Sequence, residues 1–170
     1  MKTRRKDRGE PLPGEPWNEV GPGLWMGGHV WVDRTGEVRE AVVDREFDLV
    51  ISLFTRVGHG PDPSVRHLVR TLPDAPLTAD QIGTVQELAR TATDAVRAGR
   101  SVLVRCHSGY NRSGLVVAEA LIGQGLEPAA AIALVRSRRS PRALNNRTFE
   151  DYLTTGLDVA RLLSGLDESG

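Results

Sequence analysis

The sequence predicts an α/β domain with a central mixed, mainly parallel sheet flanked by helices. Short apolar, β-like runs alternate along the chain with segments whose apolar residues recur at helical spacing. One of these runs is followed at once by a tight loop and a helix, the order expected of a parallel sheet. The predicted strands are 24–26, 48–53, 68–70 and 101–104.

The chain has 170 residues, of which 39% are apolar, and this suits one domain around one core. Residues 1–16 combine charge with proline and glycine and show no hydrophobic period, so they predict a flexible tail. The folded domain is predicted to span 17–165.

Charge and cysteine content limit the partners and the compartment. The 22 basic and 22 acidic residues cancel, which gives no general attraction for DNA. A single cysteine, Cys106, excludes an internal disulfide and makes a zinc site improbable, so we expect a reducing compartment and no metal or other cofactor. No stretch approaches the roughly 18 apolar residues of a membrane span. These features predict a cytoplasmic protein that does not bind membranes.

The first clear helix begins at a capping box, Thr78-x-x-Gln81, and ends at Gly99. Three more helices are predicted after the strand at 101–104. They cover about 113–123, about 128–139 with Pro128 in the first turn, and about 147–163.

The loop Cys106-His107-Ser108-Gly109-Tyr110-Asn111-Arg112 separates a Cys from an Arg by five residues, between a strand and a helix. Five residues can curl the backbone around a small anion, with several amide N–H groups and the helix dipole directed at it. Gly109 tolerates the positive φ that such a curl needs.

This cradle has two chemical consequences. It binds a phosphate dianion, and it favours the thiolate of Cys106, the nucleophilic form, near neutral pH. The planar Arg112 guanidinium can donate two parallel hydrogen bonds to phosphoryl oxygens, a geometry that Lys lacks. Ser113 can donate its hydroxyl to the sulfur and ease departure of the thiolate.

Cys106-x5-Arg112-Ser113 resembles the signature of the protein tyrosine phosphatase superfamily, and the surrounding chain resembles its small dual-specificity branch. Residues 19–27 are similar to the opening strand of that branch, and Ala143-Leu144-Asn145-Asn146-x-x-Phe149 is similar to its closing segment. The resemblance implies hydrolysis of phosphotyrosine, with or without phosphoserine and phosphothreonine, through a phosphocysteine intermediate, with a phosphorylated protein as the partner.

The family usually has His immediately before the Cys, whereas this sequence has Arg105. Strand alternation predicts that Arg105 points away from Cys106. A catalytically weak phosphate-binding pseudophosphatase is therefore one alternative, and an RNA 5′-triphosphatase-like enzyme is another, because Asn111-Arg112-Ser113-Gly114 is similar to the loop of that group.

A departing alkoxide or phenoxide needs a proton, and Asp74 is the candidate acid. It lies in a proline-containing loop, Leu72–Leu77, at a distance of 106 − 74 = 32 residues from the nucleophile, as in small members of the family. The rival Asp80 falls in the first turn of the capped helix, where it complements the helix dipole.

The remaining loop residues, His107, Ser108, Gly109, Tyr110 and Asn111, are predicted to surround the substrate or to satisfy the loop backbone. His29, His59 and His67 show no ligand spacing and are predicted to be surface residues. A basic cluster is predicted to be a solvated helix end, with attraction of a phosphorylated partner as the alternative. The cluster comprises Arg136, Arg138, Arg139, Arg142 and Arg147.

Overall fold

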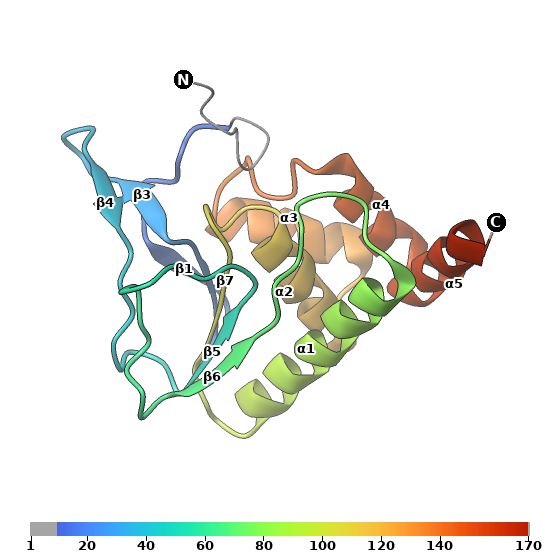
Figure 1. The fold of residues 1–170 in the computed structure, drawn as a ribbon, viewed down its shortest axis with the longest axis horizontal. Helices are drawn as coiled ribbons and strands as arrows, with labels where there is room; N and C mark the ends of the chain where they lie inside the picture. The colour runs from blue at the N-terminus through green and yellow to red at the C-terminus, as the bar shows by residue number, and fades with distance from the viewer. Residues whose placement is uncertain (1–9, 170) are drawn as a thin grey trace.

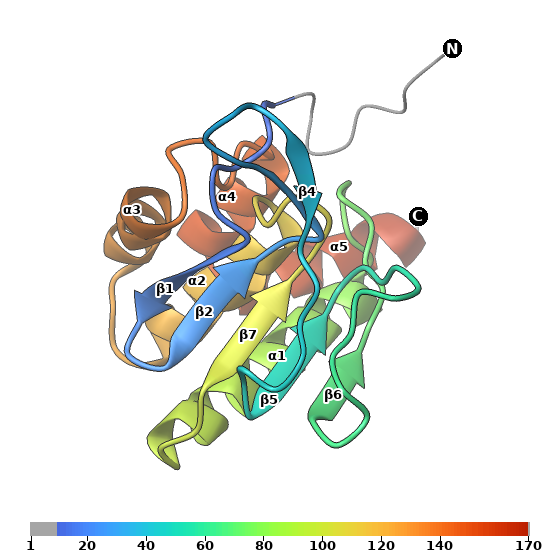
Figure 2. The same cartoon turned by 90° about the vertical axis from the view of Figure 1, so that its left-hand side faces the viewer.

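The computed structural model describes residues 10–169 and contains a five-stranded sheet of order β1-β2-β7-β5-β6 (Figures 1 and 2). β1 pairs antiparallel with β2, and the other three pairs are parallel. The predicted mixed, mainly parallel sheet is therefore confirmed. The strands are β1 (Trp17–Gly21), β2 (Leu24–Gly27), β5 (Leu49–Ser52), β6 (Arg66–Val69) and β7 (Val102–Arg105).

The helices gather on one face of the sheet, and a separate ribbon of two short strands, β3 (Val30–Val32) and β4 (Val38–Glu40), lies to one side (Figure 1). Figure 2 looks at the sheet with the helices behind it. The helices are α1 (Ala79–Arg97), α2 (Arg112–Gly123), α3 (Pro128–Arg138), α4 (Arg147–Thr155) and α5 (Leu157–Ser169).

Alternation along the strands divides the apolar side chains between the two faces. In β7, Val102 and Val104 join the large core under the helices, whereas Leu103 joins a smaller cluster on the opposite face. The smaller cluster contains Phe47, which stacks edge-on against Trp17 and Trp25. Because both faces of the central strands are buried, these strands are continuous apolar runs in the sequence.

The predicted capping box is present: the Thr78 hydroxyl accepts from the Gln81 amide at 3.2 Å, and the Gln81 side chain accepts from the Thr78 amide at 2.9 Å. The single helix predicted over 147–163 is instead two helices, because Gly156 at φ +101° ends α4. β3 and β4 were not predicted: β3, Val30-Trp31-Val32, is apolar but has only three residues, and β4, Val38-Arg39-Glu40, is not an apolar run.

The predicted flexible tail, residues 1–16, lies only in part within the described residues. Its residues 1–9 lie outside the described residues, whereas residues 10–16 lie against the domain. Their carbonyl groups bind the folded chain: Pro11 accepts from the Tyr110 hydroxyl, Pro13 from the Val32 amide and Pro16 from the Gly28 amide. A segment without an apolar period can still be ordered by main-chain hydrogen bonds to a tertiary surface.

Candidate active site

The sequence-predicted loop follows the central strand β7 and leads into α2, so its residues lie where parallel strands end and a helix begins. Cys106 is fully buried, as are Asn111 and Ser113, and Arg112 is only 7% exposed. The structure thus places three of the four predicted catalytic residues, Cys106, Arg112 and Ser113, at the carboxyl end of the central strand.

The five loop carbonyls from residue 107 to residue 111 all accept hydrogen bonds from groups outside the loop. The C=O and N–H groups of trans peptides point in opposite directions, so anchored carbonyls leave the amide groups directed into the curl. The donors are the amides of His29, Leu144 and Leu115 to residues 107, 110 and 111, and the Arg139 guanidinium to residues 108 and 109.

Gly109 is required at the tightest point of this curl. Its φ is +77°, and a Cβ there would lie 2.6 Å from both the Gly27 backbone and the Arg139 guanidinium. An alanine would therefore be strained by its conformation and would collide with both supports of the loop.

Arg139 was predicted to belong to a solvated basic cluster, and the structure shows that this prediction is wrong for Arg139. It is buried, and besides the loop carbonyls of Ser108 and Gly109 it donates to the Glu15 carbonyl and the Asn18 side chain, each at 2.8 Å. A buried guanidinium requires several acceptors, and the curled loop supplies two of them. Sequence spacing alone could not separate Arg139 from its exposed neighbour Arg138.

Ser113 and Arg112 lie on the helix side of the loop. The Ser113 Oγ is 3.3 Å from the Cys106 Sγ, the contact that the predicted expulsion of the thiolate requires. Arg112 donates from Nη1 to the Leu72 carbonyl at 3.3 Å and lies 5.7 Å from the centre of the Phe54 ring. Its buried Nε has no hydrogen-bond partner among the described residues, so this donor remains for an anion in the cradle.

Asp74 lies beside the loop. Its two carboxylate oxygens accept from the side-chain amides of Asn111 at 3.0 Å and Asn146 at 2.7 Å. Asn146 also caps α4, where its Oδ1 accepts from the Phe149 amide. Asp80 remains exposed in the first turn of α1. Sequence reasoning quoted Asn146 only for the family resemblance and missed its contact with Asp74, because the two residues are far apart in the chain.

A buried polar cluster behind the loop contains His29 and His59, each only 2% exposed. The prediction that these two histidines lie on the surface is therefore wrong. Arg105, at the end of β7, donates to the carbonyls of Gly28, Ala41 and His59 at 2.6–3.0 Å. A guanidinium without a carboxylate needs several acceptors, and the buried backbone provides them. His67, by contrast, is half-buried and bonds to Ser52.

The tautomers of this cluster follow from Arg105, which can only donate. Its Nη2 lies 3.3 Å from His29 Nδ1, so this nitrogen accepts, and it also accepts from His59 Nδ1 at 3.0 Å. His29 Nε2 then carries the proton and donates to the Phe54 carbonyl at 2.9 Å. Burial, and next the charge of Arg105, lowers the pKa of His29 to about 3, in agreement with a neutral ring.

Phe54 connects this cluster to the loop. Its ring packs edge-on against His29 and His107, and the Arg112 guanidinium lies over it. Burial lowers the pKa of His59 and His67, and the charge of Arg105 lowers both further, while Glu40 opposes the shift at His59. Burial lowers the pKa of Arg105 itself to about 10. Arg105 therefore remains charged at neutral pH, on the face of β7 opposite the large core that contains Cys106.

Within residues 10–169, no group of three or more His, Cys, Asp or Glu side chains is arranged to hold a metal ion. No helix of that part of the chain is long and apolar enough to cross a membrane.

Known structures share this fold and this arrangement of elements. Human DUSP28 is 27% identical, with a TM-score of 0.67 over 88% of this chain and 97% of that one. These similarities support a small dual-specificity-phosphatase-like member of the protein tyrosine phosphatase superfamily. A mouse putative dual specificity phosphatase complexed with zinc tungstate is 26% identical, with a TM-score of 0.61 over 88% and 92% of the two chains. No protein-family model and no curated protein sequence matches the chain.

Kinase associated phosphatase, which carries a serine in place of its catalytic site cysteine, is 17% identical with a TM-score of 0.60, and it shares the fold alone. The match covers 89% of this chain and 97% of that chain. The two neighbours above 25% identity support phosphatase activity for this chain at the level of the class. The roles assigned above to single residues stay predictions.

Proposed function

We propose that this chain hydrolyses phosphate monoesters in proteins, phosphotyrosine foremost, through a phosphocysteine intermediate. The observation that supports this most directly is the cradle itself. Its five consecutive carbonyls are anchored outward, Cys106 stands at one end and Arg112 at the other, and Ser113 contacts the sulfur at 3.3 Å.

In the first step the Cys106 thiolate attacks phosphorus, and the bond between phosphorus and the leaving oxygen breaks. The phosphoryl charge spreads over its equatorial oxygens, which the loop amides and Arg112 stabilise by hydrogen bonds. Asp74, in its protonated form, gives a proton to the departing oxygen, and the product is the free hydroxyl compound.

In the second step water attacks the phosphocysteine, and Asp74, now a carboxylate, accepts the proton of that water. The bond between sulfur and phosphorus breaks, inorganic phosphate leaves, and the thiolate returns. The Ser113 hydroxyl donates to the sulfur as its charge develops, which lowers the barrier to this departure.

A protein substrate is favoured because the neighbours above 25% identity are named as dual-specificity phosphatases. The loop contains no lysine, which makes a polyphosphorylated inositol lipid less suitable. The neutral net charge of the chain argues against the RNA 5′-triphosphatase alternative, since RNA-binding proteins usually have a basic face.

The deciding experiment measures phosphate release from phosphotyrosine, phosphoserine and phosphothreonine peptides, phosphoinositides and triphosphorylated RNA, without added metal. We expect turnover of phosphotyrosine peptides by the wild-type chain. Failure to turn over any substrate, with phosphate binding retained, would favour the pseudophosphatase alternative.

Cys106→Ser is the matched variant, because a serine hydroxyl stays protonated where the thiol ionises. It should bind vanadate or phosphate and lose turnover. Activity within about tenfold of wild type would contradict nucleophilic attack by Cys106, since covalent catalysis depends on an activated nucleophile.

A further inference from the structure

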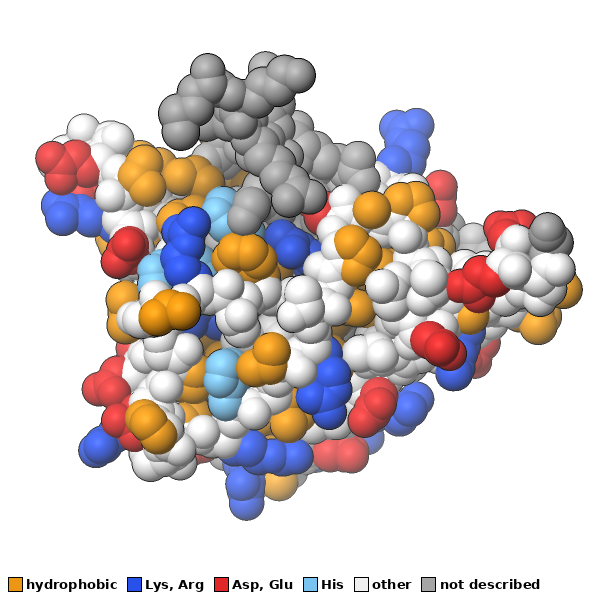
Figure 3. Space-filling model, in the orientation of Figure 1, with side chains coloured by type: hydrophobic (Ala, Val, Ile, Leu, Met, Phe, Trp, Pro, Cys, Tyr) orange, Lys and Arg blue, Asp and Glu red, His pale blue; other side chains and the backbone are white. Residues whose placement is uncertain are grey.

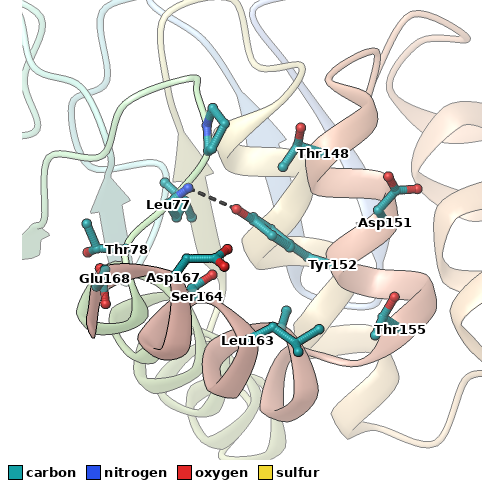
Figure 4. Close-up of a pocket in the computed structure, with 12 residues that line it drawn as sticks. Leu77, Thr78, Thr148, Asp151, Tyr152, Thr155, Leu163, Ser164, Asp167 and Glu168 are labelled. Carbon is teal, nitrogen blue, oxygen red and sulfur yellow. Dashed lines mark hydrogen bonds between the residues drawn. The ribbon is translucent and has the colours of Figure 1, made fainter. Parts of the chain in front are cut away.

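A groove of about 540 Å³ lies between α4, α5 and the segment before α1 (Figure 4). Pro76, the Tyr152 ring and Leu163 give it an apolar lining. Three carboxylates border it: Asp151 from α4, and Asp167 and Glu168 from α5. The chemistry proposed above does not use any of these side chains.

The charged residues that line the groove are all acidic, since none of its lining residues is a Lys or an Arg. Glu168 already accepts a hydrogen bond from the Ala79 amide at the start of α1. Asp151 and Asp167 are exposed and form no hydrogen bond or ion pair with the described residues. These two carboxylates are therefore available to a cation from outside.

Apolar side chains are exposed next to these carboxylates. Leu163, which lines the groove, is 52% exposed, and Leu162 and Leu166, on the same helix but outside the lining, are 67% and 63% exposed. In Figure 3, apolar and acidic side chains lie close together at the end of the molecule formed by α5. The surface thus fits a segment that carries both positive charge and an apolar side chain.

α4 connects the groove to the loop that carries Asp74. The Leu77 amide donates to the Tyr152 hydroxyl at 2.9 Å, as Figure 4 shows. At the start of α4, the Asn146 side chain donates to Asp74 at 2.7 Å. Both ends of the 74–77 segment are therefore hydrogen-bonded to the helix that forms one wall of the groove.

We propose that the groove binds a basic segment of the phosphoprotein substrate, containing Lys or Arg with an adjacent apolar residue, close to the phosphorylated residue. This inference rests on the function proposed above. The α4 residues from Thr148 to Thr155 line the groove. At 1.5 Å per helical residue they extend about 12 Å, which about four residues of extended peptide cover.

The test uses four peptides. Two contain phosphotyrosine and two contain unphosphorylated tyrosine, and in each pair one peptide has an Arg-Leu-Arg-Leu segment beside the tyrosine and the other lacks it. On the wild-type chain, we expect kcat/KM for the phosphopeptide with this segment to exceed that for its partner about tenfold. In Asp151→Lys/Asp167→Lys, the preference should disappear while kcat/KM for p-nitrophenyl phosphate stays unchanged. The control Glu87→Lys/Asp94→Lys makes the same charge change on exposed positions of α1 and should retain the preference.

Fluorescence anisotropy with the unphosphorylated basic peptide separates this inference from the proposed function, because it needs no turnover. Binding that is lost in Asp151→Lys/Asp167→Lys but kept in the control supports the groove even if the chain proves inactive. Equal binding by both double variants would overturn the proposal. Sedimentation showing a dimer that Leu163→Asp abolishes would also overturn it, because a second copy would then occupy this surface.

Discussion

At the scale of the residue, Asp74 is the assignment that kinetics can test most directly. Its carboxylate is held by Asn111 from the loop and Asn146 from the start of α4, so one side chain joins the cysteine loop to the neighbouring helix. This position gives a geometric reason to prefer it over Asp80, which is exposed on α1.

Asp74→Asn should slow hydrolysis of phosphotyrosine by roughly 10²–10⁴-fold, because a phenoxide of ordinary basicity leaves poorly without a proton. Nitrophenyl phosphate, whose leaving group is stable as an anion, should lose much less. Comparison of kcat for the two substrates checks this dependence on the leaving group. Asp80→Asn should leave both rates unchanged, and an equal loss on both substrates in Asp74→Asn would place the acid elsewhere.

Glu119 on α2 gives a prediction for stability. Burial, with the nearby Asp158 charge as the second cause, raises the pKa of Glu119 to about 7 from 4.5, while the Arg90 charge opposes the rise. Because the folded-state pKa is the higher one, the folded state binds more protons between these two values. The contribution of Glu119 is therefore favourable below pH 4.5 and is lost as pH rises to 7.

Glu119→Gln should accordingly remove this loss and be more stable than wild type at pH 8, by about 1 kcal/mol after allowance for partial solvent exposure. Urea unfolding of both proteins at pH 5 and pH 8 measures this difference in the free energy of unfolding. Wild-type and variant free energies that change in parallel between the two pH values would contradict the assignment.

At the scale of the element, the end of α3 acts as a support for the cysteine loop. Arg139 follows the last residue of that helix, and its guanidinium binds two loop carbonyls together with Glu15 and Asn18. α3 therefore contributes to the shape of the cradle although the sequence places it well beyond the loop.

Arg139→Lys should lower kcat/KM by about 10², because an ammonium cannot replace the planar fork and a loop displaced by about 1 Å loses that much. Phosphatase assays together with circular dichroism distinguish lost positioning from unfolding. Arg138→Lys, at the exposed neighbouring position, is the matched control and should behave as wild type. Retention of activity within twofold in Arg139→Lys would refute the role.

At the scale of the whole molecule, residues 10–16 join the start of the described chain to the Cys106 loop. The Tyr110 hydroxyl donates to the Pro11 carbonyl at 2.6 Å across 99 positions of sequence, and Glu10 pairs with Arg142 at 3.3 Å. Tyr110, 1% exposed, is thereby a structural contact of the loop in addition to its predicted place at the substrate.

Tyr110→Phe should cost about 1 kcal/mol of unfolding free energy, the usual net value of one hydrogen bond. It should also make Glu10 and Glu15 more susceptible to a glutamate-specific protease, since the segment loses an anchor. Urea unfolding and timed proteolysis test the two effects. Unchanged cleavage would mean that the remaining main-chain bonds hold the segment alone.

The sequence by itself determined the sheet class, α1 with its capping box, and the Cys106-x5-Arg112 loop, because these depend on local periodicity and on neighbouring residues. The tertiary structure decided which of the adjacent arginines is buried, that His29 and His59 surround Arg105, and that Asn146 reaches Asp74. It also decided that residues 10–16 pack on the domain. These features join residues distant in sequence, and burial of a charge depends on acceptors that only the folded chain assembles.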